Sequence, residues 1–130
     1  MLFRRYHVLP MWLGIKTYTR RFWKYPRRVG SIHQCKHDYT EFSFGELTVL
    51  DCYRQPLGMM TEKDAYMEGG YSLPEYQRTL EQITKKPWDP TASVWVCKFR
   101  FVPSDVLDPN GGTGDFDEYK RLYYEHMREI

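Results

Sequence analysis

Apolar residues follow strand-like spacing in the first half of the chain and helix-like spacing in the second half. Stretches of β-branched and aromatic residues predict short strands at residues 2–3, 17–19 and 31–35, and one or two strands within 42–53. Residues 93–102 show the clearest strand pattern, so we expect this strand at the centre of the sheet. A short helix over residues 7–13, ended by Gly14, is expected after the first strand.

Capping signals mark two helices in the middle of the chain. Thr61 can accept a hydrogen bond in the first turn of a short helix that ends near residues 69–70. Ser72 and Glu75 form a capping box that begins a longer helix over residues 73–85. Apolar residues recur at helical spacing in this second helix, which indicates a face packed on the core rather than a ligand site: Leu73, Tyr76, Leu80 and Ile83.

The end of the chain contains a loop signal followed by a helix signal. Residues 103–115 are rich in Pro, Gly, Asp and Asn and predict a mobile loop. A helix is expected from about Asp115, with one apolar face made of Phe116, Tyr119, Tyr123, Met127 and Ile130. We expect residues 1–102 to form the main domain and residues 103–130 to pack on that same domain.

The composition is that of one soluble domain. The chain has 130 residues, of which 42% are hydrophobic and 17% aromatic, which argues against a two-domain enzyme, a disordered chain and a repeat array. No apolar run approaches the ~20 residues that span a bilayer, and the first residues lack the apolar segment of a signal peptide. We therefore expect a cytoplasmic protein with no membrane partner.

Cysteine and histidine spacing gives no metal-binding pattern. The three cysteines, Cys35, Cys52 and Cys97, include no CxxC pair, so neither a disulfide framework nor a zinc ribbon is indicated. His33 and His37 flank Cys35, but residues four apart in a strand lie roughly 13 Å from each other, too far to share one ion. We expect buried thiols, no metal and no cofactor.

Charge is distributed unevenly, although the net charge is only +2. The first 37 residues contain nine Lys or Arg and no acid, whereas the remaining 93 contain ten basic and 17 acidic residues, an asymmetry that favours a polyanionic partner. Cations alternate with aromatic residues over 20–28, which suits single-stranded nucleic acid because guanidinium groups neutralise phosphate and rings stack on bases. The alternative is a solvated hairpin whose charges pair with the acidic remainder. The predicted RNA-binding residues are Lys16, Arg20, Arg21, Trp23, Lys24, Arg27 and Arg28.

A compact motif leads from the first helix into the following strand: Gly14-x-Lys16-x-x-Thr19-x-Arg21. It resembles the ASCH family of PUA-like proteins, whose signature is G-x-K-x-x-E-x-R, with Thr19 at the usual Glu position. Segments 61–76 and 88–101 are similar to further blocks of that family, so the resemblance spans about residues 2–102. It implies an α+β fold with a small PUA-like β-barrel flanked by helices, to which this chain adds a C-terminal helix. It also implies a cleft for RNA or a nucleoside beside the motif.

With Thr19 in place of Glu, the motif is similar to that of members that remove the acetyl group from 4-acetylcytidine, which implies Lys16, Thr19 and Glu68 as a catalytic set. A lysine in a partly desolvated, cationic pocket can have its pKa lowered toward neutrality and accept a proton. Thr19 could then attack the amide carbonyl or position water, while protonated Glu68 donates to the leaving nitrogen and Arg21 stabilises an oxyanion. The alternative is a Lys16–Glu68 ion pair in a cleft that only holds its ligand.

The number and position of the cations favour ligand binding over catalysis. More cations and aromatic residues follow the motif than a small substrate requires, so we favour binding of RNA or a modified nucleoside in the basic cleft. Amide hydrolysis of 4-acetylcytidine is the alternative, and ribonuclease activity, also attributed to some relatives, comes third. A protein-interaction module that uses the last helix would leave the basic first third unused. We expect a monomer or weak homodimer.

Overall fold

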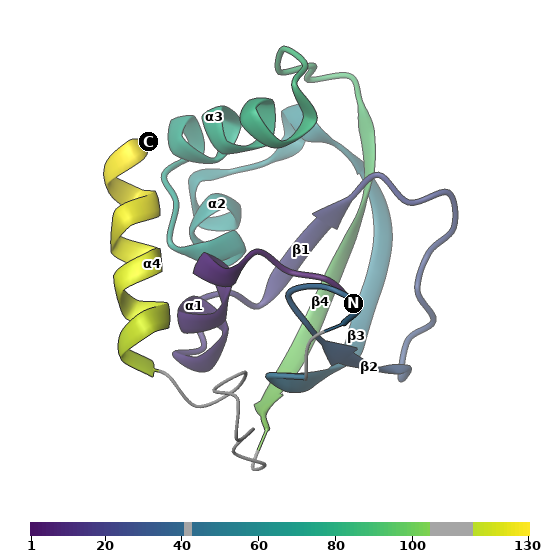
Figure 1. The fold of residues 1–130 in the computed structure, drawn as a ribbon. Coiled ribbons are helices and arrows are strands. Elements are labelled where there is room, and N and C mark those ends of the chain that lie inside the picture. Colours follow the sequence, from purple (N-terminus) through teal and green to yellow (C-terminus); the bar gives the residue numbers. More distant parts are fainter. Residues whose placement is uncertain (41–42, 105–115) are drawn as a thin grey trace.

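The helices and strands of this protein form a mixed α+β fold (Figure 1). The computed structural model describes residues 1–40, 43–104 and 116–130. In these residues the strands are β1 (Tyr18–Arg21), β2 (Ile32–Cys35), β3 (Gly45–Pro56) and β4 (Ser93–Pro103). The helices are η1 (Arg5–His7), α1 (Val8–Trp12), η2 (Leu57–Met59), α2 (Glu62–Gly69), α3 (Leu73–Thr84) and α4 (Phe116–Glu129). No helix in these ranges combines the length and the apolar character that crossing a membrane requires.

The strands form one antiparallel sheet in the order β1-β4-β3-β2. Within the described residues β1 and β2 are its edges, so the sheet does not close and the predicted barrel is wrong. The physical reason is that α2 packs on β1, and just before this strand the Thr17 N–H donates to the Met67 carbonyl of α2 (2.9 Å), so a helix rather than a further strand lies beside β1. Leu2 and Phe3, predicted as a strand, contribute only an isolated bridge from Leu2 to Lys36.

Strand β4 has the central position that its sequence predicts, between β1 and β3. On one face of the strand, Cys97 and Phe99 pack into the main hydrophobic core. On the other face, Val94 and Val96 pack against Leu57 in a separate cluster next to α3. Burial on both faces explains why this segment is almost continuously apolar in its first half.

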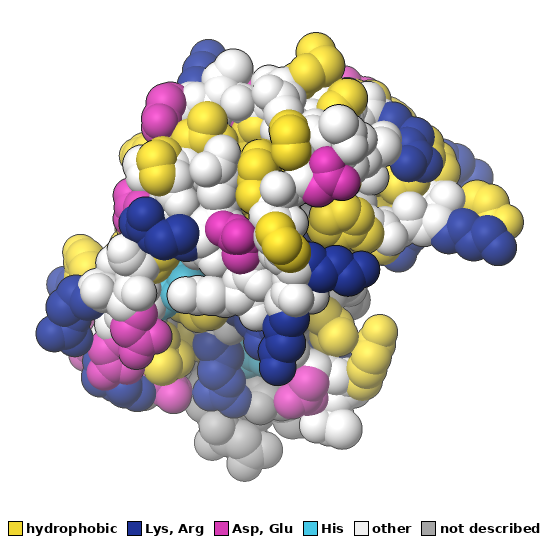
Figure 2. Space-filling model, turned by 90° about the horizontal axis from the view of Figure 1, so that it is seen from above, with side chains coloured by type: hydrophobic (Ala, Val, Ile, Leu, Met, Phe, Trp, Pro, Cys, Tyr) yellow, Lys and Arg dark blue, Asp and Glu magenta, His cyan; other side chains and the backbone are white. Residues whose placement is uncertain are grey.

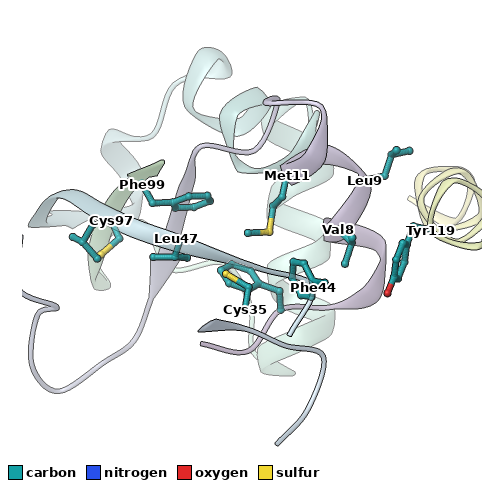
Figure 3. Close-up of a cluster of buried hydrophobic side chains, with 11 residues drawn as sticks. Val8, Leu9, Met11, Cys35, Phe44, Leu47, Cys97, Phe99 and Tyr119 are labelled. Carbon is teal, nitrogen blue, oxygen red and sulfur yellow. The ribbon is translucent and has the colours of Figure 1, made fainter. Parts of the chain in front are cut away.

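The main core lies between the sheet, α1 and α4 (Figure 3). Figure 3 shows Val8 and Met11 from the N-terminal helix, Phe44 beside the strands and Tyr119 from the last helix around one apolar interior. Tyr119 is only 1% exposed, and its hydroxyl lies 3.0 Å from Nε2 of His37. Helix α4 therefore packs on the same core as the sheet. The loop predicted over residues 103–115 lies, from residue 105 onward, outside the described residues.

The apolar face predicted for α4 contacts the rest of the domain along the whole helix. At its first turn Phe116 stacks on Trp12, with ring centroids 5.8 Å apart. At its last turn Met127 and Ile130 pack on the cluster that contains Tyr76. Figure 1 shows the helix alongside α1 and α2, with its end beside the start of α3. The predicted spacing of apolar residues in this helix is confirmed.

The junction between α2 and α3 positions an acidic side chain inside the protein. The caps predicted at Thr61 and Ser72 are both present, each as a capping box. Between the two helices the chain turns at Gly70, whose φ of 86° is in the left-handed region and where a Cβ would lie 2.5 Å from the Tyr123 hydroxyl. Because α2 stops abruptly before this turn, Glu68 lies at its end against β1 and is only 3% exposed.

Candidate functional site

A pocket of about 410 Å³ lies beside β1, the edge strand that α2 approaches. Its polar lining brings together residues of the sequence motif and of α2 and α3: Lys16, Thr19, Arg20, Arg21, Glu68 and Thr79. Its apolar lining includes Phe3, Tyr71, Tyr76, Leu80 and Ile83. The structure thus brings the three residues predicted for catalysis, Lys16, Thr19 and Glu68, to one pocket, together with two further residues predicted to bind RNA, Arg20 and Arg21.

Lys16 lies in the short connection between α1 and β1 and is 2% exposed. Its ammonium group donates to the carbonyl oxygens of Tyr18 and Glu68, both at 2.8 Å, and to Oε2 of Glu68 at 3.3 Å. Three acceptors match the three protons of an ammonium group. Burial nevertheless lowers the pKa of Lys16 from 10.5 to about 8, although the charge of Glu68 opposes this shift.

Glu68 links Lys16 to a second buried cation. Oε1 of Glu68 accepts a hydrogen bond from Nη1 of Arg20 at 2.9 Å, while Oε2 faces Lys16. The Arg20 guanidinium also donates from Nη2 to Gln55 at 3.3 Å and lies 3.7 Å from Asp64. The Lys16–Glu68 ion pair, which the sequence left as the alternative to catalysis, is therefore present. In this structure Glu68 is an acceptor, and its role as a proton donor stays a prediction.

Thr19 and Arg21 lie on the opposite face of β1 from Arg20, because side chains alternate along a strand. Nε of Arg21 donates to the Thr19 hydroxyl at 2.8 Å, and Nη2 donates to the Leu2 carbonyl at 2.7 Å. The guanidinium carbon also lies 4.9 Å from the centre of the Phe3 ring. Thr19 is held in this way by a cation, and its own hydroxyl proton is left to donate.

Nε of Arg20 and Oγ1 of Thr79, on side chains of the pocket lining, are buried without a hydrogen-bond partner among the described residues. Both side chains are almost completely buried, Thr79 at 3% and Arg20 at 7% exposed. An unpaired buried polar group costs free energy, so such groups are rare unless they serve a ligand or water. Neither atom is accessible to solvent in this structure, so a molecule in the pocket reaches them only if neighbouring side chains move.

Positive charge dominates the pocket. Among its described lining residues, Arg4, Lys16, Arg20 and Arg21 face a single acid, Glu68. This excess favours a ligand that is anionic or rich in carbonyl oxygens. The described residues contain no group of three or more His, Cys, Asp or Glu that could hold a metal ion.

The remaining predicted RNA-binding residues lie outside the pocket, on the segment between β1 and β2, which we call the β1–β2 arm (residues 22–31). Figure 2 shows Lys, Arg and hydrophobic side chains gathered on the projection at the right, where Figure 1 places this arm. Arg27 stacks on Trp23, with its guanidinium carbon 4.0 Å from the ring centre, and Arg21 lies 5.9 Å from the same ring. Trp23 thus connects the pocket to the arm, where Lys24 and Arg28 are exposed.

Sequence reasoning missed a histidine–tyrosine–histidine chain at the pocket. The Tyr71 hydroxyl lies 2.9 Å from Nε2 of His7 and 2.8 Å from Nε2 of His126 on α4. Burial lowers the pKa of His7 well below its usual value and that of His126 to about 4, so both rings are neutral at pH 7. His7 and Tyr71 line the pocket. These three residues are far apart in the sequence, so no local pattern indicates that they are in contact. The sequence alone therefore did not identify a partner for either histidine.

Comparison with known proteins identifies the fold. No family model matches the sequence, and no curated protein does. An ASCH domain from Lactobacillus crispatus JV V101 has a TM-score of 0.63 and 12% identity, covering 75% of this chain and 71% of that one. A DUF984-family protein from Enterococcus faecalis V583 has a TM-score of 0.61 and 16% identity, covering 82% of this chain and 73% of that one. The chain therefore has an ASCH-like fold, as the motif around Lys16 and Thr19 predicts.

We expect the Lys16 ammonium to titrate near pH 8, because burial disfavours its charged form more than Glu68 favours it. NMR of the lysine Cε resonances would measure the midpoint, and Lys16→Met would identify the Lys16 signal. Glu68→Gln should lower the midpoint further, since it removes the negative charge at nearly constant size. A wild-type midpoint at the ordinary lysine value of ~10.4, or an upward shift in Glu68→Gln, would contradict this electrostatic picture.

Proposed function

We propose that the pocket binds one nucleobase, presented by RNA or by a modified nucleoside. The observation that carries this proposal is the lining of the pocket, which combines several cations with aromatic rings: Arg4, Lys16, Arg20, Arg21, Phe3, Phe22, Tyr71 and Tyr76. Nucleobases expose carbonyl oxygens and ring nitrogens that accept hydrogen bonds, together with N–H groups that donate them. A base can therefore accept hydrogen bonds from the cations of the pocket, whereas a purely apolar ligand would desolvate these cations without compensation.

The size and the apolar lining of the pocket also suit a base. A volume of about 410 Å³ is at the small end of ligand sites, which are typically about 300–1,000 Å³. Phe22, which lines the pocket and is 55% exposed, supplies an accessible aromatic ring, and bases stack readily on such rings. The chemistry of the pocket thus combines an aromatic stacking surface with positive charge, which suits an electron-rich ring.

RNA is favoured over a free nucleoside by the β1–β2 arm. Its cations, Lys24, Arg27 and Arg28, lie beyond the pocket and are not required to hold a single base. Arg27 stacked on Trp23 offers both a charge for phosphate and a flat face for stacking. In this proposal the base enters the pocket and the sugar–phosphate chain follows the arm.

Replacement of Thr79 by Val tests the pocket directly. Thr79→Val removes the unpartnered hydroxyl at nearly constant shape, so the free protein should keep or gain stability. Binding of cytidine, of 4-acetylcytidine and of a ten-nucleotide RNA, measured by calorimetry, should weaken about tenfold for the ligand that uses this hydroxyl, the cost of one buried hydrogen bond. Thr48→Val on β3, away from the pocket lining, is the matched control. If Thr79→Val is stable and binds every ligand with wild-type affinity, the Thr79 hydroxyl is not part of the binding site.

The contribution of the arm is measurable as salt dependence. Arg27→Ala combined with Arg28→Ala should weaken binding of single-stranded RNA to a similar extent for different sequences. The slope of log affinity against log salt should become less steep by about 1.4, since each phosphate contact on a single strand contributes about 0.7. Lys98→Ala combined with Arg100→Ala, an equal charge change at exposed positions of β4, is the control. If the slope is unchanged in the arm variant, these two arginines do not contact phosphate and are only solvated surface residues.

A second candidate function is hydrolysis of the acetyl amide of 4-acetylcytidine, and the environment of Lys16 is what favours it. With a pKa of about 8, roughly a tenth of Lys16 is uncharged at pH 7 and able to accept a proton. The Thr19 hydroxyl lines the same pocket beside the Arg21 guanidinium, a suitable partner for an oxyanion. In the reaction water breaks the C–N bond between the acetyl carbon and N4; the acetyl group leaves as acetate, and the nitrogen takes a proton to give cytidine.

Incubation with 4-acetylcytidine, followed by chromatography of released cytidine, tests this candidate. If the protein is a hydrolase, Lys16→Met and Thr19→Val should each lose at least about 100-fold in turnover, the usual contribution of a positioned base or nucleophile. The rate should rise with pH through about 8, because the uncharged form of Lys16 is the active one. Lys98→Ala combined with Arg100→Ala should retain the wild-type rate. Absence of cytidine release by the wild-type protein would leave binding as the function.

A further inference from the structure

A second pocket, of about 420 Å³, adjoins the first one. The two pockets share three lining residues, Phe22, Leu80 and Thr84, so they are neighbours along the end of α3. Neither the motif nor the predicted RNA-binding residues contribute to the second pocket. It is formed by the C-terminal end of α3 together with the segment 86–92 and η2.

The second pocket has the lining of a stacking site. Trp88 is its largest side chain, and the ring of Trp88 meets the edge of Tyr76, which lines the first pocket, at a centroid distance of 6.4 Å. Leu57 and Ala92 complete an apolar surface. Phe22 belongs to both pockets and is 55% exposed, so its ring is accessible to a molecule bound in either one.

The walls of the second pocket are held in place by backbone hydrogen bonds. The Leu57 N–H donates to the Ala92 carbonyl at 2.9 Å, and the Gly58 N–H donates to the Pro90 carbonyl at 2.8 Å. A Cβ on Gly58 would lie 2.9 Å from that same Pro90 oxygen, so the two segments approach as closely as glycine allows. This site is therefore preformed, which reduces the entropy lost when a ligand binds.

The polar rim of the second pocket carries both signs of charge. Glu81 accepts a hydrogen bond from the Trp88 backbone N–H at 3.3 Å, and Asp89 accepts two from Thr91. These carboxylates match the N–H donors of a base with an exocyclic amino group, whereas Lys86 matches a phosphate. The rim thus suits a nucleotide better than an apolar side chain of another protein.

We propose that the second pocket holds the neighbouring base of the same RNA strand, with Phe22 between the two bases. This inference rests on the function proposed for the first pocket and specifies its ligand: a single-stranded segment of at least two nucleotides, of which the second bears an exocyclic amino group. The free nucleoside fills only the first pocket. The shared lining residues make the two sites parts of one continuous binding surface.

Calorimetry with small probes tests this proposal. The probes are cytidine, cytidine 3′-phosphate, cytidine 5′-phosphate and the dinucleotide CpC. CpC should bind the wild-type protein about tenfold or more tightly than any of the three mononucleoside probes, because one stacked base contributes about that much. Two further probes, CpU and UpC, each replace one cytosine by uracil, which has no exocyclic amino group. The dinucleotide that places uracil in the second pocket should bind less tightly than CpC.

Two variants test whether the higher affinity for CpC comes from the second pocket. Ala92→Leu fills the second pocket without touching the first, so it should bind CpC no more tightly than the cytidine phosphates while cytidine binding stays at the wild-type level. Lys86→Ala, at an exposed position, should lose part of the CpC affinity and none of the cytidine affinity. Val102→Leu, an enlargement at an exposed position of β4, is the control, and circular dichroism verifies folding.

The outcomes separate the two proposals. Equal affinity of the wild-type protein for CpC and for the cytidine phosphates overturns the second site and leaves the first pocket as a nucleoside site. A CpC gain that survives both Ala92→Leu and Lys86→Ala also overturns it, because the second base would then lie elsewhere. If no probe binds, including cytidine, the function proposed for the first pocket fails, and this inference fails with it.

Discussion

The structure depends on one buried ionic network, in which Glu68 accepts from Lys16 on one oxygen and from Arg20 on the other. Charged groups this deeply buried persist only when each is paired and hydrogen-bonded, and removing one partner typically costs about 3–5 kcal/mol. The network joins the end of α2 to the edge of β1 across more than forty residues of chain. Together with the hydrogen bond from the Thr17 N–H to the Met67 carbonyl, it holds α2 against β1, beside the pocket.

The same network gives the pocket its chemistry. Two cations share one carboxylate, and Arg21 adds a third positive charge from the other face of the strand. The turn at Gly70 ends α2 two residues after Glu68, so Glu68 lies in the last turn of the helix, beside β1. Several residues that line the pocket also form this network, so the effect of a Lys16 substitution on folding is harder to separate from its effect on the pocket than that of Thr79→Val, which lies outside the network.

Helix α4 is integrated with both the core and the pocket. Tyr119 is among the most buried large side chains, and His126 reaches Tyr71, whose ring lines the pocket. The contact extends from Phe116 on Trp12 at one end to Ile130 at the other, where the terminal carbonyl accepts from Arg78 at 3.0 Å. A helix with so many contacts on its apolar face does not present that face to a partner, which disfavours a protein-interaction module built on it.

The sequence alone determined the local features: the caps at Thr61 and Ser72, the strand at residues 93–102, the apolar face of α4 and the motif around Lys16. Each arises from hydrogen bonds or side-chain periodicity within a few residues, so its signal is present in a short window of sequence. Only the tertiary structure decided that the sheet stays open, that Glu68 pairs with Arg20 as well as Lys16, and that Thr79 and Tyr71 line the pocket. These outcomes depend on contacts between distant segments, whose approach is set by packing of the whole chain rather than by local preference.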